Sequence, residues 1–283
     1  MTPVPLARIT FEPLVRAALL EDLGRAGDLT TDAIVPAGLV ARAALVARET
    51  GVVAGLDLAK LAFELIDPNI AMQVEISDGA TVTTGGAIAR VRGPARGILM
   101  AERTALNFLG HLSGIASATA SVVAAVRGTK AKITCTRKTT PGLRAVEKYA
   151  VRAGGGANHR FGLDDAILIK DNHIAVAGGI AQALRRARAA AGHLVKIEVE
   201  IDDLDQLEEA LGEGADAVLL DNMSLDRLAK AVATVAGRAM TEASGRVTLE
   251  SAPAIAATGV DLISVGWLTH SAAALDIGLD FEV

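Results

Sequence analysis

Residues 196–237 read KIEVEIDDLDQLEEALGEGADAVLLDNMSLDRLAKAVATVAG. Two short runs rich in Ile, Val and Leu, at 196–201 and 217–222, alternate with stretches of helical apolar spacing at 204–211 and 224–235. Such alternation is typical of βα units, in which helices connect parallel strands and cover the sheet. This part of the chain therefore predicts an α/β fold with a parallel sheet.

The same rhythm continues on both sides of this stretch. Strand starts recur roughly every twenty to thirty residues, which is the spacing of a parallel α/β barrel. The further strands are expected at 132–138, 166–172, 239–244 and 261–266, and the further helices at 143–153, 180–191 and 252–257.

In the first hundred residues the predicted strands do not alternate regularly with helices. Helices are expected at 12–23, 56–65 and 95–126, where Gly110 and Gly114 are possible breaks, and strands at 40–48, 72–76 and 87–91. The first hundred residues therefore differ in organisation from the rest of the chain.

Residues 78–86, DGATVTTGG, resemble the hammerhead turn of biotinyl and lipoyl carrier domains. A carrier needs a lysine at the tip of this hairpin, but the chain has no lysine between Lys60 and Lys130. We therefore interpret the segment as a structural element.

Composition excludes several classes of function. The net charge of −5 argues against a broad nucleic-acid surface, and the single cysteine, Cys135, excludes an internal disulfide and a cysteine-based metal cluster. The N-terminus has no sustained apolar stretch, and the longest apolar runs are too short to cross a bilayer. We expect a cytoplasmic protein without nucleic-acid or membrane partners.

Charged residues follow successive predicted strands. Because the carboxyl ends of parallel strands meet at one mouth of a barrel, these side chains are expected to converge there. A cluster of basic residues in an acidic protein indicates a small ligand with several negative charges, since guanidinium forks match carboxylates and lysine supplies a point charge. The positive set contains Arg137, Lys138, His159, Arg160 and Lys170.

Two carboxylates, Glu200 and Asp221, end the next two predicted strands. Paired carboxylates suit Mg²⁺, although salt bridges to the lysines are an alternative use for them. Ser244-Gly245 and Gly266 end the last two strands and leave backbone N–H groups open to a phosphate. The barrel mouth is thus predicted to bind a polyanion, a divalent cation and a phosphate group.

Long ordered strings in the chain resemble the quinolinate phosphoribosyltransferase family. The likeness covers nearly the whole chain. The strings are TRKTTPGLR at 136–144, GGGANHR at 154–160, IKDNH at 169–173, EDLG at 21–24, GDLTT at 27–31, RTALN at 103–107, LTHS at 268–271 and LDIG at 275–278.

The resemblance implies a type II phosphoribosyltransferase fold, in which an N-terminal α/β, hammerhead-like domain precedes an incomplete seven-stranded α/β barrel. The N-terminal domain is expected at residues 1–112, joined by the C-terminal residues 275–283, and the barrel at residues 113–274. It also implies a homodimer or higher homo-oligomer, in which Arg103 reaches the barrel mouth of the neighbouring subunit. The implied reaction joins quinolinate to phosphoribosyl pyrophosphate and gives nicotinate mononucleotide, pyrophosphate and CO₂ for NAD synthesis.

The resemblance also implies residue roles. Lys138, Lys170, Glu200 and Asp221 would be catalytic, and Glu200 and Asp221 would bind Mg²⁺ and the ribose–pyrophosphate end. The carboxylates of quinolinate would be held by Arg103, Arg137, His159, Arg160 and Lys170, with Lys138 between the substrates. The 5′-phosphate would be bound by Ser244, Gly245, Gly266 and His270.

Two residues depart from the commonest family pattern, and both lie beside the predicted phosphate loop. Arg246 stands where a second glycine usually follows Ser-Gly, and Trp267 stands where a small residue usually follows Val-Gly. Two alternatives stay open. One is a type II relative that uses nicotinate or is linked to molybdenum, and the other is a non-catalytic pyridine-dicarboxylate-binding protein. The abundance of cations favours a dicarboxylate over nicotinate, which has one carboxylate.

Overall fold

The computed structural model describes residues 3–282, and the chain forms two compact units. The N-terminal unit comprises Met1–Ala120, Thr139–Gly155 and Leu268–Val283, and the barrel unit comprises Ser121–Lys138 and Gly156–Trp267. Compared with the expected boundaries, residues 113–120, 139–155 and 268–274 pack with the N-terminal unit instead of the barrel.

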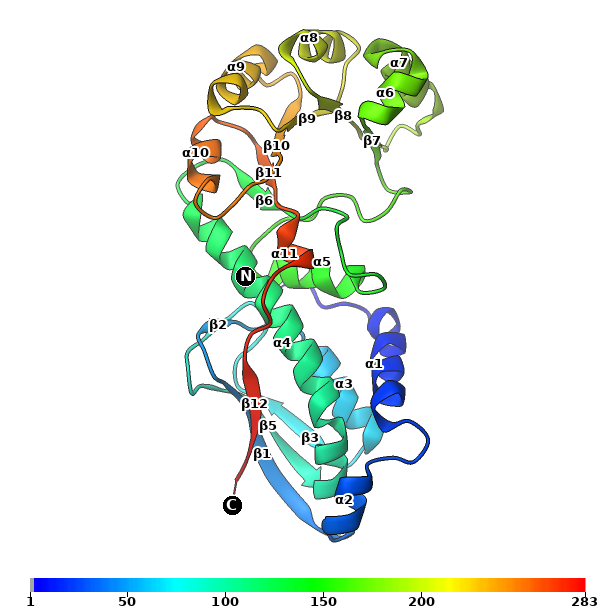
Figure 1. The fold of residues 1–283 in the computed structure, drawn as a ribbon, viewed down its shortest axis with the longest axis vertical. Coiled ribbons are helices and arrows are strands. Elements are labelled where there is room, and N and C mark those ends of the chain that lie inside the picture. Colours follow the sequence, from blue (N-terminus) through cyan, green and yellow to red (C-terminus); the bar gives the residue numbers. More distant parts are fainter. Residues whose placement is uncertain (1–2, 283) are drawn as a thin grey trace. The chain divides into compact units, whose positions relative to one another are not determined.

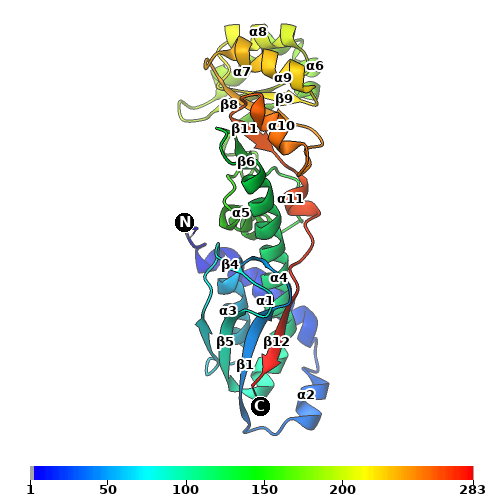
Figure 2. The same ribbon diagram turned by 90° about the vertical axis from the view of Figure 1, so that its left-hand side faces the viewer.

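An antiparallel sheet forms the centre of the N-terminal unit, in the order β12-β1-β5-β3 (Figure 2). The C-terminal strand pairs with β1, where Ala43 faces Phe281 and Ala47 faces Ile277. Residues far apart in the chain therefore share one sheet. The strands are β1 (Val40–Ala47), β3 (Ala71–Val74), β5 (Ala87–Pro94) and β12 (Ile277–Phe281).

Helices cover this sheet, and α3 packs against both α1 and β3 (Figure 1). The first turn of α2 is capped by Asp28, whose carboxylate accepts the backbone N–H of Thr31 at 2.9 Å. This short helix follows the first helix at a point where the sequence predicted none. The helices are α1 (Arg8–Leu23), α2 (Leu29–Ile34), α3 (Leu56–Ile66) and α4 (Ala95–Ala125).

The longest helix, α4, runs unbroken through both glycines that were possible breaks. A Cβ atom on Gly114 would lie 2.0 Å from the carbonyl oxygen of Ala273, so this glycine allows the C-terminal segment to approach the helix closely. By length and composition α4 could cross a membrane, but half of its most apolar window is buried in the protein. Core helices meet the same criterion, and Leu109, Leu112 and Ile115 are fully buried.

The hammerhead-like segment is a small structural unit. Strand β2 (Gly51–Val52) pairs with β4 (Thr81–Val82) in a two-stranded sheet. Asp78 is buried and accepts the backbone N–H groups of Gly55 and Leu56 at the start of α3, together with the Tyr149 hydroxyl at 2.6 Å. Burial raises the pKa of Asp78, and these hydrogen bonds oppose the rise because they favour its ionised form.

Six parallel strands form the barrel unit in the order β6-β11-β10-β9-β8-β7. A seventh segment adds only an isolated parallel bridge between Ala157 and Thr134 beside β6. The expected seven-stranded incomplete barrel is therefore realised as six strands and one bridging segment. The strands are β6 (Lys132–Thr134), β7 (Ile167–Ile169), β8 (Ile197–Ile201), β9 (Ala217–Asp221), β10 (Met240–Ser244) and β11 (Leu262–Ser264).

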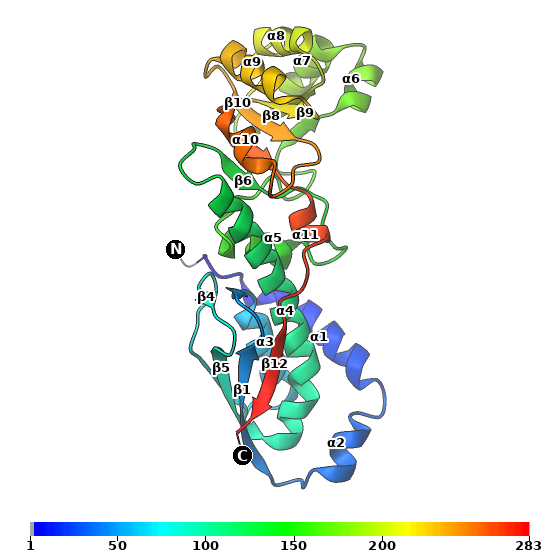
Figure 3. The ribbon, with the colours of Figure 1, turned by 60° about the vertical axis from the view of Figure 1, so that its left-hand side comes forward.

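Helices α7, α8 and α9 lie on the outer side of these strands (Figure 3). Asp203 and Ser224 cap α8 and α9 through side-chain oxygens that accept backbone N–H groups three residues later. The expected helices appear in their places, whereas α6 and α11 were not predicted. The helices that follow α4 are α5 (Arg144–Ala153), α6 (Asp171–Ala177), α7 (Ile180–Ala190), α8 (Leu204–Gly212), α9 (Leu225–Val235), α10 (Ala252–Ala257) and α11 (Trp267–His270).

Candidate active site

Polar side chains of the barrel strands alternate with buried apolar ones. In β8, Ile197, Val199 and Ile201 are buried, and between them lie Glu198 and Glu200. Side chains two residues apart share one face of a strand, so the two glutamates lie on the same face. In the same way Glu242 and Ser244 share a face of β10, and β10 pairs with β9 so that Ser244 lies beside Asp221. The residues predicted at strand ends, Glu200, Asp221 and Ser244, therefore lie in regular strands of the barrel unit.

An ion pair joins two of the predicted catalytic residues. The Nζ of Lys170, directly after β7, lies 2.9 Å from Oε2 of Glu200, whose residue is only 9% exposed. The salt bridge considered as an alternative for the acidic residues is therefore present at Glu200. Asp221 instead accepts a hydrogen bond from the side-chain amide of Asn222.

Two arginines come together near the start of the barrel. Burial, and next the positive charge of Arg137, lower the pKa of Arg160. The Nη1 of Arg160 donates to the carbonyl oxygen of Ala166 at 3.0 Å, and its Nε is buried without a hydrogen-bond partner among the described residues. Neighbouring guanidinium groups of this kind are stabilised by an anionic ligand that accepts their hydrogen bonds.

Both ring nitrogens of His159 are engaged. Nδ1 lies 2.7 Å from the backbone N of Arg160, which can only donate, so Nδ1 is the acceptor. Nε2 lies 2.9 Å from Oε2 of Glu198 and 3.7 Å from Oε2 of Glu242. The ring therefore carries its proton on Nε2 and donates it toward the carboxylates.

Glu198 and Glu242 had no role assigned from the sequence. Glu242 is 1% exposed, and its Oε1 has no hydrogen-bond partner among residues 3–282. Burial, and next the negative charge of Glu198, raise the pKa of Glu242 to about 7. The signal that could have found these residues is the polar alternation in β8 and β10, which places them one layer below Glu200 and Ser244.

Two groups of residues could hold a metal ion. The ligand atoms of His159, Glu198 and Glu242 all lie within 4.8 Å of one another. The other group, Glu200 and Asp221, offers only carboxylate oxygens from adjacent strands, and such ligands suit Mg²⁺ together with substrate phosphate.

Close packing shapes the predicted phosphate loop. Gly245 has a φ of +106°, and a Cβ atom there would lie 2.2 Å from Oδ1 of Asn222, so only glycine fits. Arg246 also has a positive φ of 45°, which explains why glycine suits that position. The indole N–H of Trp267 donates to the carbonyl oxygen of Val247 at 2.9 Å and ties the loop after β10 to the segment after β11.

The barrel unit contains most of the predicted site residues. Arg103, an exposed residue of α4, and His270, an exposed residue whose Nδ1 lies 2.6 Å from the Ser271 hydroxyl, belong to the N-terminal unit. The barrel unit contributes Arg137, Lys138, His159, Arg160, Lys170, Glu200, Asp221, Ser244, Gly245 and Gly266.

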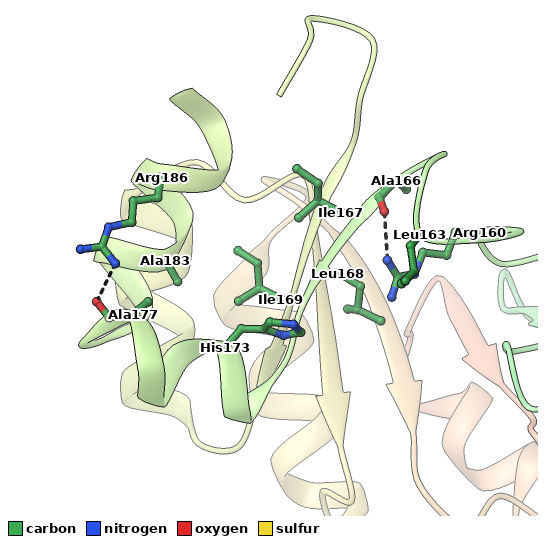
Figure 4. A pocket seen from close by; sticks show the side chains of 10 residues that line it. All are labelled: Arg160, Leu163, Ala166, Ile167, Leu168, Ile169, His173, Ala177, Ala183 and Arg186. Atoms are coloured by element: carbon green, nitrogen blue, oxygen red, sulfur yellow. Dashed lines mark hydrogen bonds between the residues drawn. The ribbon is translucent and has the colours of Figure 1, made fainter. Parts of the chain in front are cut away.

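An apolar cavity of about 280 Å³ lies beside β7 (Figure 4). Its lining includes Leu163, Ile167 and Ala183, and it shares Arg160 with the arginine pair. The guanidinium of Arg160 is turned toward Ala166 in this view. The mainly apolar lining does not match the polyanionic ligand that the strand ends predict.

Comparison with known proteins identifies both parts of the chain. Residues 28–113 match the quinolinate phosphoribosyl transferase N-terminal domain, and residues 115–280 match the C-terminal domain. The nicotinate-nucleotide pyrophosphorylase [carboxylating] of Mycobacterium leprae (strain TN) is 51% identical over 94% of this chain and 95% of its own. The probable enzyme of that name from Bacillus subtilis (strain 168) is 47% identical over 96% and 93%.

A solved structure agrees with these relatives. The nicotinate-nucleotide pyrophosphorylase from Francisella tularensis superimposes with a TM-score of 0.95, at 40% identity, and covers 98% of both chains. The sequence resemblance and the expected fold are thereby confirmed. With both domain models matched in order along the chain, the protein belongs to the quinolinate phosphoribosyltransferase family.

Proposed function

We propose that this protein transfers the phosphoribosyl group of phosphoribosyl pyrophosphate to quinolinate, with loss of CO₂, and so forms nicotinate mononucleotide and pyrophosphate. The observation that carries the proposal is the pairing of two guanidinium groups with buried Nε atoms, Arg137 and Arg160, in the same unit as the Lys170–Glu200 pair. A dicarboxylate supplies the negative charge that these arginines need. A family member with this arrangement is suited to quinolinate.

In this proposal Arg137 and Arg160 bind the two acceptor carboxylates, and Lys170 adds a point charge at the mouth. Arg160 has a buried Nε without an acceptor in the part of the chain that the structure describes, and a carboxylate oxygen of the substrate would satisfy it. An unpaired buried donor costs roughly 1–3 kcal/mol, so filling it favours binding of an acid with matching geometry. Nicotinate, with one carboxylate, would leave part of this positive charge uncompensated.

Glu200 and Asp221 are proposed to hold Mg²⁺ at the pyrophosphate end of the donor. When bound, the ion would absorb negative charge that develops on the departing pyrophosphate. Lys170 would hold Glu200 in place until the donor arrives, because it already forms an ion pair with that carboxylate. Gly245, with Ser244 and Gly266, would offer backbone N–H groups to the 5′-phosphate, and Lys138 would lie between the substrates.

Positioning is the main catalytic device in this scheme. The pyridine nitrogen attacks C1 of the ribose as pyrophosphate leaves, and holding both reactants in line can supply roughly 7–11 kcal/mol. The resulting cationic ring stabilises the electron pair that the breaking C–CO₂ bond leaves on the ring carbon, and a proton from water then forms the C–H bond of the product. No protein nucleophile is needed, and the one cysteine, Cys135, is buried with its Sγ 3.4 Å from Oδ1 of Asn158.

The assembly and location are also proposals. We expect a homodimer or higher homo-oligomer in the cytoplasm, in which Arg103 of each subunit contacts the acceptor acid bound by its neighbour. The exposed position of Arg103 on a rigid helix supports this role, since a long buried helix fixes the direction of its outward side chains.

The decisive test measures release of labelled CO₂ from carboxyl-labelled quinolinate. Release should require both quinolinate and phosphoribosyl pyrophosphate, and EDTA should abolish it until Mg²⁺ is added back. In parallel, nicotinate replaces quinolinate and formation of nicotinate mononucleotide is measured. Turnover with nicotinate and none with quinolinate would reject the proposed acceptor.

A further inference from the structure

Three side chains meet inside the barrel unit below the proposed substrate site. His159 comes from the segment that bridges to β6, Glu198 from β8 and Glu242 from β10. Their side chains are only 13%, 12% and 2% exposed, so they are largely shielded from solvent. A buried cluster of two acids and one histidine is costly unless its groups are hydrogen-bonded to one another.

Spacing alone would also allow this cluster to bind a metal ion, but the histidine has the wrong tautomer. A metal would bind the Nε2 lone pair, which requires the ring proton to be on Nδ1. Nδ1, however, accepts the backbone N–H of Arg160 at 2.7 Å, so the proton is on Nε2 and points toward Glu198. The cluster is therefore a hydrogen-bonded unit in which His159 is a donor.

The same backbone contact connects the cluster to the acceptor site. The backbone N–H of Arg160 donates to Nδ1 of His159. At the other end of the same residue, Nη1 of the guanidinium donates to the carbonyl oxygen of Ala166 at 3.0 Å. The negative charge of Glu198 also acts favourably on Arg160, whereas Arg137 acts unfavourably. Glu198 thus both orients the histidine and compensates charge in the arginine pair.

We propose that Glu198, supported by Glu242, is a positioning residue for the acceptor acid: it fixes the His159 ring, and the ring fixes the backbone from which Arg160 reaches the substrate. This inference rests on the proposed function, because it concerns the same acceptor site. Glu242 on β10 lies with its carboxylate 3.7 Å from the same ring nitrogen, so it contacts the His159 ring from a second strand. Neither glutamate needs to touch the substrate for this role.

Steady-state kinetics of Glu198→Leu and Glu198→Gln test the proposal. The leucine cannot accept the hydrogen bond from Nε2–H, so the KM for quinolinate should rise about tenfold, as expected for loss of one hydrogen bond to a charged group. The KM for phosphoribosyl pyrophosphate should stay within about twofold, because Arg160 is not proposed to contact that substrate. The amide oxygen of Gln can still accept the hydrogen bond from Nε2–H, so Glu198→Gln should keep a KM for quinolinate close to that of the wild type.

Glu208→Gln is the matched control, because Glu208 is an exposed glutamate of the same unit, paired with Arg238 at 3.6 Å, and should behave as the wild type. If Glu198→Leu raises both KM values equally and lowers the melting temperature, Glu198 only supports the fold and the proposal is wrong. An unchanged KM for quinolinate would also overturn it. Wild-type protein without quinolinate-dependent CO₂ release would instead reject the proposed function.

Nitrogen-15 NMR of the histidine rings gives a second measurement that folding defects do not mimic. The chain has five histidines, so the ring signals can be assigned by single substitutions. In the wild type His159 should be a single Nε2–H tautomer, and in folded Glu198→Gln it should remain so. An Nδ1–H tautomer in the wild type, or one equivalent of a transition metal removed by EDTA, would refute the hydrogen-bonded arrangement.

Discussion

At the scale of single residues, the barrel unit arranges its charges in two layers. The upper layer contains the Lys170–Glu200 ion pair, and the lower layer contains His159 between Glu198 and Glu242. Each glutamate in a strand is two residues from the next polar side chain, so strand periodicity alone creates both layers. The upper layer is proposed to meet the donor, whereas the lower one shapes the acceptor site.

We expect substitutions in the upper layer to lower turnover without weakening the binding of the acceptor acid. Glu200→Ala and Asp221→Ala should each lower kcat by about 10²–10³, since removing one group that stabilises charge in a transition state has costs of this order. Binding of quinolinate, measured by calorimetry, should persist because the arginine pair is intact. Asp226→Ala, at the exposed first turn of α9, is the control. Full activity in both variants would refute the metal-binding role.

The residue scale also shows which parts of the site the sequence could predict. Arg137 and Lys170 follow strands and Arg160 follows the segment that bridges to β6, so these charged residues could be predicted from their order along the chain. Glu198 and Glu242 lie within strands and 44 positions apart, and their meeting with His159 depends on how the sheet curves. Local pattern contains no information on that curvature.

At the scale of elements, strands and helices with strong apolar periodicity were predicted well. The expected helix at 224–235 appears as α9 at Leu225–Val235, because its apolar face is regular and Ser224 caps it. In contrast, α6 follows the site residue Lys170 directly and has no buried residues, so no apolar stripe marked it in the sequence. Strand β12 depends on pairing with β1, which is distant in the chain.

The loop after β10 allows a matched pair of glycine substitutions. Gly245→Ala should destabilise the protein by about 1–3 kcal/mol through backbone strain, and its collision with Asn222 should also raise the KM for phosphoribosyl pyrophosphate. Gly237→Ala has a similar positive φ of 77° but nothing within 4 Å of the added Cβ. Gly237→Ala should lower the free energy of unfolding measured in urea but leave the KM for phosphoribosyl pyrophosphate unchanged. Equal KM effects in both variants would contradict the assignment of the phosphate loop.

At the scale of the whole molecule, the chain passes between the two units at residues 120/121, 138/139, 155/156 and 267/268. Residues 139–155, which connect Lys138 to the segment of His159 and Arg160, pack in the N-terminal unit. They are held there by buried Glu147, which accepts the N–H of Thr140 at 3.1 Å and lies 3.0 Å from His111. The sequence suggested a barrel helix here, because α5 has the same amphipathic pattern as the helices of the βα units.

The proposed oligomer predicts complementation between two inactive variants. If Arg103 acts on the neighbouring subunit, a hybrid dimer of an Arg103→Ala subunit and an Asp221→Ala subunit carries both defects in the same site, and its other site is intact. Each hybrid then has one intact site, so random equal mixing of subunits should restore about a quarter of wild-type activity. Mixing Arg137→Ala with Asp221→Ala is the control: both residues belong to one barrel unit, so every site in the hybrid is defective and no activity should return. Failure of the first mixture to recover, with subunit exchange verified by mass spectrometry, would place Arg103 at its own subunit's site or at none.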